Sequence, residues 1–215
     1  MKRLSCSGFL RFAALMLAVA LLGAAKDDAP KFKTRDDKAK AEFKPKGTVN
    51  MAVNGDFTKG DKFPEGWEPM PPYVEWIDGG GDCGKCIHFK VPAPVAQSTG
   101  TKYWSDYIEV KTGHSYTFNF DCKVTGGLSL KVFLKGYMEH QGARREIYQA
   151  PVFVYGVGKD WQRYGRREVF STSHPSGRNV KWVRFMLYAY GGDAGEAWWD
   201  NVWMEEVESK PEKDL

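Results

Sequence analysis

The sequence predicts an all-β domain in which two antiparallel sheets pack as a β-sandwich of the jelly-roll kind. Three segments alternate between apolar and polar residues, as half-buried strands do: 116–122, 128–134 and 180–190. Turn-forming clusters of glycine, proline and small polar residues separate such segments, at 112–114, 126–127, 175–177 and 191–193. No long segment has apolar residues at helical spacing, and the 23 glycines and 11 prolines favour many short strands.

The N-terminal segment 1–25 has the three parts of a secretory signal peptide. Three basic residues precede the apolar run 12–22, and the small residues 23–25 follow it. The run is shorter than the ~20 residues of a membrane-spanning helix, and no later segment approaches that length. We therefore expect a secreted, periplasmic or cell-envelope protein with no membrane span after cleavage. An uncleaved leader that tethers the chain to a membrane is the alternative.

The positive charge of the chain lies near its N-terminus. The whole chain has 31 basic and 27 acidic residues, a formal net charge of +4. Residues 1–25 hold three basic and no acidic residues and 26–47 hold eight basic and five acidic ones, so 20 basic and 22 acidic residues remain, a charge of −2. The lysine-rich 26–47 predicts a flexible linker, the domain is expected at 48–208, and 209–215 is expected to be a frayed tail. A nucleic-acid-binding domain needs a basic excess of its own, so nucleic acid is not an expected partner.

The strand predicted at 180–190 has two different faces. Because successive side chains of a strand point to opposite sides, one face holds Val183, Phe185, Leu187 and Ala189. The other face holds Trp182, Arg184, Met186, Tyr188 and Tyr190. The first is a core stripe. The second is an aromatic surface with a cation in its middle, which indicates that another sheet or a flat ligand covers it.

Several short motifs resemble those of a known family. They occur at 54–57 (NGDF), 63–67 (FPEGW), 107–110, 112–113, 116–118, 161–164 and 199–202 (WDNV). In this order they are similar to secreted jelly-roll carbohydrate-binding modules of the cellulase C type, the group of families 4, 9 and 22, within the galactose-binding-like superfamily. The resemblance covers about 50–207, and it implies two facing sheets with sugar bound across one of them or at the loop edge.

Sugar binding would give the aromatic surface a ligand. A pyranose ring presents a flat patch of C–H groups that packs on an aromatic ring, while its hydroxyl groups need polar neighbours. The predicted contacts are Trp182, Arg184, Tyr188 and Tyr190 from one strand and Phe133 and Tyr137 from another. Trp76, Trp104 and Trp198 are further candidates at loops or strand ends. The alternative for each ring is packing in the core or between the sheets.

A structural calcium ion is the second implication of the resemblance. Modules of this family often hold calcium between the first and last strands, with carboxylate and carbonyl oxygens as ligands. The matching residues are Asp200 in the closing motif and Asp56 in the opening one. The family commonly has glutamate where this chain has Thr58, which weakens the expected site. The alternative role for Asp200 is to accept hydrogen bonds from turn amides.

Three cysteines follow the leader: Cys83, Cys86 and Cys122. In an exported chain they predict one structural disulfide and one remaining thiol, and Cys122 either pairs with Cys86 or stays a buried thiol. A zinc site with His88 is a weaker alternative because of its spacing along a strand. A redox motif lacks the expected helix context.

The sequence favours a binding function over catalysis. It has no Gly-x-Ser-x-Gly or His-Glu-x-x-His motif. Two carboxylates suffice for a glycoside hydrolase, and Glu139, Glu146, Glu168 and Glu196 keep that alternative open. We therefore expect non-catalytic binding of a polysaccharide or other glycan. The competing class is an extracellular structural or adhesion domain whose aromatic face packs against a protein partner in the cell envelope.

Overall fold

Most of the described chain is in strands. The structure is a computed structural model and describes residues 49–79, 84–112, 114–171 and 179–207. Its elements there are β1 (Val74–Asp78), β2 (Lys85–Val91), α2 (Ala93–Ala96), β3 (Thr101–Trp104), β4 (Ile108–Glu109), β5 (Ser115–His140), β6 (Ala143–Val154), β7 (Gln162–Ser171) and β8 (Trp182–Val207). Every pairing between these strands is antiparallel, which confirms the predicted all-β class.

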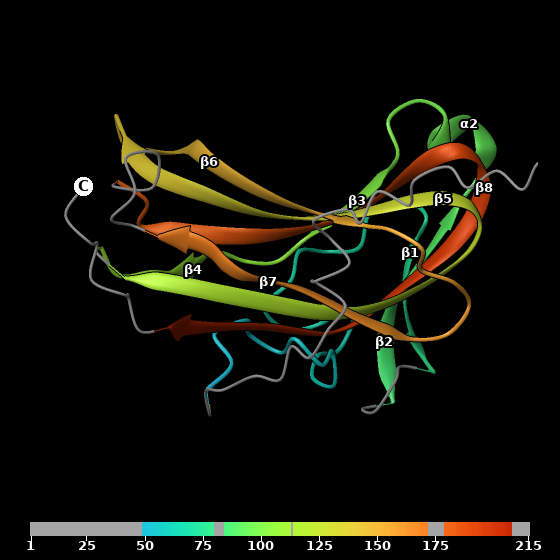
Figure 1. The fold of residues 1–215 in the computed structure, drawn as a ribbon, viewed down its shortest axis with the longest axis horizontal. Coiled ribbons are helices and arrows are strands. Elements are labelled where there is room, and N and C mark those ends of the chain that lie inside the picture. The colour runs from blue at the N-terminus through green and yellow to red at the C-terminus, as the bar shows by residue number, and fades with distance from the viewer. Residues whose placement is uncertain (1–48, 80–83, 113, 172–178, 208–215) are drawn as a thin grey trace, which may run out of the picture. The chain divides into compact units, whose positions relative to one another are not determined.

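Two layers share the long strands β5 and β8, which have 26 residues each. The first half of β5 lies between β7 and the second half of β8, and β2 and β1 follow beyond β8; we call this the β2 layer. The second half of β5 lies between β6 and the first half of β8, and β3 and β4 pair with the other edge of β8; we call this the β6 layer. Figure 1 shows β5 and β8 bending together at the right of the view as they pass between the layers. The predicted two-sheet sandwich is confirmed.

Glycines permit the bend that joins the two layers. The pairing of β5 with β8 shifts register between Gly126 and Leu128. Gly126 has a φ of 77°, and a Cβ atom there would lie 2.5 Å from the carbonyl oxygen of Ala194. A Cβ atom on Gly195 would lie 2.5 Å from the carbonyl oxygen of Thr125. Only residues without a side chain allow the two strands to approach so closely while they turn.

The core fills the space between the layers and confirms the predicted assignment of strand faces. Val183, Phe185, Leu187 and Ala189 are all fully buried, as are Tyr116, Phe118 and Phe120 from the predicted strand 116–122. Phe118 of the β2 layer packs edge-on against Phe185 of the β6 layer, with ring centroids 5.4 Å apart. Because side chains alternate along a strand, the residues between Val183 and Ala189 must point away from this core.

Three predicted segments lie outside the described residues: the signal peptide 1–25, the linker 26–47 and the tail 209–215. These assignments stay predictions. In the part of the chain that the structure describes, no helix has the length and apolar character needed to cross a membrane.

The cysteines correct one expectation. Cys86 and Cys122 are both free and buried, so the bridge that could have joined them is absent. Burial raises the pKa of Cys86 to about 11 and raises the pKa of Cys122 well above its usual value. Both lie on strands of the β2 layer, and Cys122 packs in the hydrophobic core as a small apolar group. Cys83 lies outside the described residues.

Candidate functional site

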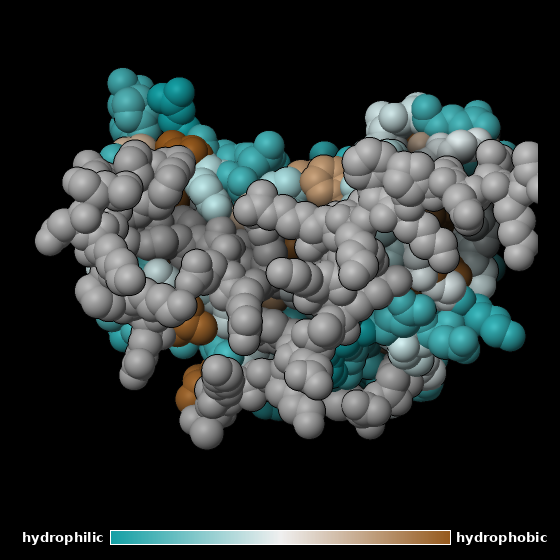
Figure 2. All heavy atoms as spheres, in the orientation of Figure 1, coloured by the Kyte–Doolittle hydropathy of each residue, from teal (hydrophilic) through white to brown (hydrophobic). Residues whose placement is uncertain are grey.

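The outer face of the β6 layer gathers the residues predicted to bind sugar. Directly opposed residues of antiparallel strands point to the same side of a sheet. The pairs Tyr137–Trp182, Lys135–Arg184, Phe133–Met186 and Lys131–Tyr188 therefore share the side that faces away from the core. Register with β3 and β6 adds Lys102, Trp104 and Phe153 to the same side. In Figure 2 the upper edge of the molecule is raised at both ends and lower between them. The raised ends lie where Figure 1 places the β5–β6 hairpin at the left and α2 at the right.

Five rings form an open cluster at one end of this face. We call it the aromatic platform, and it consists of Phe133, Phe153, Tyr155, Tyr188 and Tyr190. The rings of Tyr188 and Tyr190 are stacked at 5.1 Å with an interplanar angle of 11°, and Phe133 lies 6.4 Å from Tyr188. Phe153 and Tyr155 are stacked at 6.0 Å and are 43% and 55% exposed. Phe133, Tyr188 and Tyr190 are half-buried, so the cluster offers partly exposed rings and is a candidate binding surface.

A lysine connects the two halves of the platform. The Nζ atom of Lys131 lies 4.3 Å from the ring centroid of Tyr190 and 4.8 Å from that of Phe153. An ammonium group is attracted to the negative face of an aromatic ring, so the rings from β8 and β6 hold Lys131 between them. Lys102 on β3 is exposed and lies directly across from Tyr188. The platform therefore carries two cations as well as five rings.

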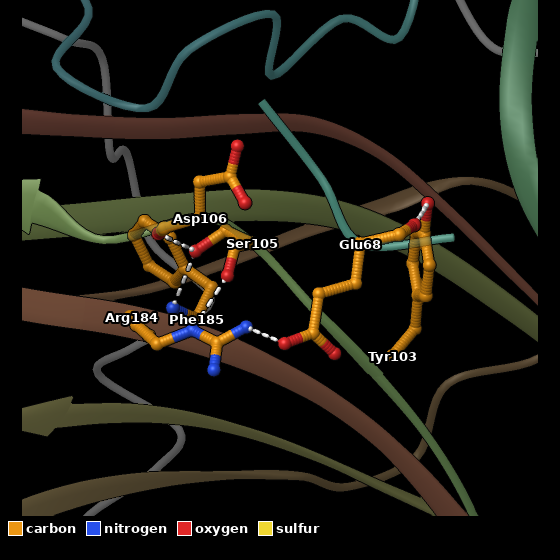
Figure 3. A network of polar contacts seen from close by, with 6 residues as sticks. All are labelled: Glu68, Tyr103, Ser105, Asp106, Arg184 and Phe185. Atoms are coloured by element: carbon orange, nitrogen blue, oxygen red, sulfur yellow. Dashed lines mark hydrogen bonds and ion pairs between the residues drawn. The ribbon is translucent and has the colours of Figure 1, made fainter. Parts of the chain in front are cut away.

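The middle of the face is covered around Arg184. Arg184 is 9% exposed; its Nε donates a 2.7 Å hydrogen bond to the carbonyl oxygen of Ser105, and its Nη2 forms an ion pair with Glu68. The amide of Phe185 donates to Ser105 Oγ at 2.9 Å, and the Tyr103 hydroxyl donates to the carbonyl oxygen of Glu68 at 2.8 Å. Figure 3 shows this network, in which the guanidinium group joins β8 to two loop segments. Arg184 thus positions loops beside the platform.

The far end of the face is also partly closed. Tyr137 is 7% exposed and packs edge-on against Tyr107 at 5.1 Å, and burial raises the pKa of Tyr137 to about 12. Trp182 is half-buried, and the guanidinium carbon of Arg144 lies 4.8 Å from its ring centroid. The six predicted contacts therefore share one face but divide into two groups. Phe133, Tyr188 and Tyr190 belong to the platform, Arg184 and Tyr137 are buried at the other end, and Trp182 is half-buried there beside Arg144.

Sequence reasoning missed Phe153 and Tyr155. Both follow the strand periodicity of 150–155, where Val152 and Val154 are buried and the residues between and after them point outward. This alternation was present in the sequence as a signal, although Pro151 interrupts the hydrogen-bonding pattern of a typical strand. Trp104 was a lesser candidate, and it lies on the same face with Arg184 stacked 5.0 Å from its ring centroid.

The aromatic residues on the β2 layer are engaged with one another. The imidazole of His88 stacks on Trp198 at 4.5 Å, and Lys123 Nζ lies 4.9 Å from Trp198 and 4.8 Å from Trp161. Trp76 donates its indole N–H to the carbonyl oxygen of Phe57 at 2.8 Å. Trp76 and Trp198 therefore have contacts within the β2 layer, and a role for them in sugar binding stays a prediction.

A second concave feature lies where the segment 50–59 meets β8. This pocket has a volume of about 530 Å³, and its lining includes Asn50, Asn119, Arg163 and Trp203. Much of its polar surface is already used: Asn50 bonds to the backbone of β8, and Arg163 makes two 2.7 Å bonds to the carboxylate of Asp121. The buried Asn119 Nδ2 has no hydrogen-bond partner among the described residues. The pocket lacks the ring cluster of the platform.

The two aspartates of the expected calcium site have other contacts. Asp56 Oδ1 accepts from the amide and hydroxyl of Thr58 at 3.3 and 3.1 Å, and Asp200 is fully buried with Oδ1 accepting the Asn201 amide at 2.7 Å. Within the described ranges, no group of three or more histidine, cysteine, aspartate or glutamate side chains is arranged to hold a metal ion. Calcium ligands also include backbone carbonyls, so calcium binding at Asp56 and Asp200 stays a prediction.

Comparison with solved structures supports the fold assignment. A structure titled as a family 16 carbohydrate-binding module superimposes with a TM-score of 0.50 at 17% identity, over 74% of this chain and 100% of the module. The enzymatically active domain of tailspike protein 4 from bacteriophage CBA120 matches with a TM-score of 0.53 at 15% identity, over 74% of this chain and 22% of the tailspike chain. The chain therefore shares its jelly-roll sandwich fold with these two structures.

At this level of identity the likeness establishes the jelly-roll fold alone. No protein-family model matches the chain. No curated protein matches its sequence either. The tailspike match concerns only about a fifth of a much longer chain. The surface of the jelly roll is therefore the observation that bears on function.

Proposed function

We propose that this protein binds carbohydrate without catalysing a reaction, and that the sugar lies on the aromatic platform. The observation that carries the proposal is the open ring cluster on the outer face of one layer, with Tyr188 and Tyr190 stacked and Phe153 and Tyr155 exposed. Flat C–H faces of sugars pack on such rings and displace water from them. The structural likeness to a carbohydrate-binding module supports the same function.

Polar groups surround the rings where sugar hydroxyls would lie. Ser129 is exposed and pairs across the sheet with Tyr190, and Gln149 is exposed and pairs with Lys135. These side chains can donate and accept hydrogen bonds with hydroxyl groups. In this proposal the rings provide most of the affinity, and the polar groups orient the sugar. Arg184 and Tyr137 support the neighbouring loops instead of contacting the ligand.

The location proposed for this activity is outside the cytoplasm. The predicted leader 1–25 supports a secreted, periplasmic or envelope protein, where polysaccharides are available as ligands. The protein-partner alternative has one observation in its favour. The other edge of β6 pairs with no strand among the described residues, and an edge strand of this kind can add a strand from another chain.

Affinity electrophoresis of the full chain tests the proposal. Gels that contain soluble xylan, β-glucan, galactan or polygalacturonate should retard the wild-type protein in at least one case. Tyr188→Ala should migrate as in a gel without polysaccharide, because it removes the ring that contacts both Phe133 and Tyr190. Tyr73→Ala is the matched control, since Tyr73 is 47% exposed and precedes β1 in the β2 layer.

Two results would overturn the proposal. The first is wild-type migration that no polysaccharide changes, which would favour the protein-partner alternative. The second is equal retardation of wild type and Tyr188→Ala, with circular dichroism showing that the variant is folded. Retardation of wild type and Tyr73→Ala but not Tyr188→Ala would support the platform as the binding site.

A further inference from the structure

We infer that the aromatic platform selects anionic carbohydrate, in which the sugars carry carboxylate or sulfate groups. This inference rests on the proposed function and adds a ligand class to it. It depends on the charges around the platform, which differ in sign from the charge of the domain. Residues 48–215 have 20 basic and 22 acidic residues, yet the residues that pair with Tyr188 and Tyr190 on β3 and β5 are Lys102, Lys131 and Ser129, and the carboxylate of Glu146 on the same face is taken up by Lys135.

The cations elsewhere on this face are already paired. Lys135 Nζ lies 3.0 and 3.1 Å from the two carboxylate oxygens of Glu146, and its side chain is 15% exposed. Arg184 forms its ion pair with Glu68. Both pairs lie toward the covered end of the face. Their charges are therefore neutralised within the protein and contribute little to the attraction of a ligand.

Lys102 and Lys131 differ from these paired cations. Among the described residues, neither lysine forms an ion pair with an aspartate or glutamate. Both flank Tyr188, Lys102 from β3 and Lys131 from β5, so a sugar stacked on Tyr188 would have an ammonium group on each side. Two uncompensated charges of one sign at a binding surface attract ligands of the opposite sign.

The position of Lys131 adds a reason for a charged partner. Its Nζ is held 4.3 Å from the Tyr190 ring and 4.8 Å from the Phe153 ring, so the ammonium group lies between two stacking surfaces. An anionic substituent on a sugar that binds at these rings would lie within reach of the ammonium group. A lysine is a compact point charge, which accepts either a carboxylate or a sulfate group. The geometry therefore specifies the sign of the ligand charge and leaves its source open.

Matched pairs of polymers test this inference with the full-length wild-type protein. Polygalacturonate and its methyl-esterified form share a backbone and differ in charge, and dextran sulfate and dextran form a second pair. We expect about ten-fold or greater preference for the charged member of at least one pair at low salt, which is about 1.4 kcal/mol. The preference should shrink as sodium chloride is raised from about 0.05 to 0.5 M, because salt screens charges at an exposed site.

Three lysine variants then locate the charge that matters. Lys131→Met keeps most of the aliphatic stem, and we expect binding of the charged polymer to weaken about ten-fold and binding of its neutral twin to change less than about two-fold. Lys102→Gln should have a similar but smaller effect, and Lys131→Arg should retain the preference. Lys159→Gln is the charge-matched control, because Lys159 is exposed and no ion pair or ring contact is seen for it in the described chain.

The outcomes separate this inference from the proposed function. The inference is supported if the wild-type protein prefers the charged polymers, Lys131→Met loses this preference and Lys159→Gln keeps it. The polymer pair that shows the preference then identifies the anionic group as carboxylate or sulfate. Equal binding of charged and neutral twins, or equal effects of Lys131→Met and Lys159→Gln, overturns the inference while the sugar platform stands. Absence of binding to every polymer overturns both.

Discussion

Replacement of Arg184 by methionine distinguishes a supporting residue from a ligand contact. The variant loses the hydrogen bond to the Ser105 carbonyl, the ion pair with Glu68 and the stacking on Trp104 and Tyr107. The charge-assisted hydrogen bond contributes about 1.5 kcal/mol or more. Each cation–π contact contributes about 0.5–1 kcal/mol. The ion pair adds less than about 1 kcal/mol, because the Glu68 side chain is 45% exposed. We expect the free energy of unfolding to fall by about 2–4 kcal/mol, within the range for loss of a buried polar network.

Urea denaturation followed by tryptophan fluorescence measures this change. Glu68→Gln is the control, since it keeps an oxygen acceptor for Arg184 and removes only a half-exposed charge; we expect a loss below about 1 kcal/mol. In buffer without urea, where Arg184→Met remains folded, the affinity of the variant for the polysaccharide that retards the wild-type protein should stay within about two-fold of the wild-type value. A stability loss below about 0.5 kcal/mol together with lost sugar binding would refute the supporting role and make Arg184 a ligand contact.

Three further predictions concern titration, thiols and calcium. The hydrogen bond from His114 lowers the pKa of Glu206. The ionised carboxylate therefore stabilises the fold above its unfolded pKa, and this stabilisation is lost as the pH falls through the lower folded pKa. In Glu206→Gln the free energy of unfolding should fall less steeply as the pH is lowered. Cys86 and Cys122 should fail to react with a thiol reagent at pH 8 and should react after denaturation in guanidinium, and fast labelling at Cys86 or Cys122 of the native protein would contradict their burial. Calcium in place of EGTA should raise the melting temperature of wild type and not of Asp200→Asn, and equal melting of wild type with and without calcium would remove calcium from the account.

The fold could be predicted because its strands follow a simple periodicity. The alternation in 180–190 assigned Val183 and Phe185 to the core and Tyr188 to the outer face, and the structure confirms this assignment. Burial of one face dictates the register of a strand, so the pattern carries this information locally. The continuity of β5 and β8 through both layers was not predicted, because the glycines at the bend also resemble those of ordinary turns.

The site could be predicted only as far as strand faces reach. The six proposed contacts do share one side of a sheet, but the sequence could not show which end of it stays open. The cover over Arg184 comes from Glu68, 116 residues away, and from Ser105, 79 residues away. Contacts between such distant segments depend on how loops pack after the sheet has formed.

The position of a bound oligosaccharide tests the central claim most directly. A crystal structure of the full chain soaked with an oligosaccharide of the polymer that retards it should show sugar rings packed on Tyr188, Tyr190 and Phe153, with an anionic substituent near Lys131. A sugar bound instead in the pocket beside Asn119, or a platform covered by a second protein chain, would contradict the claim.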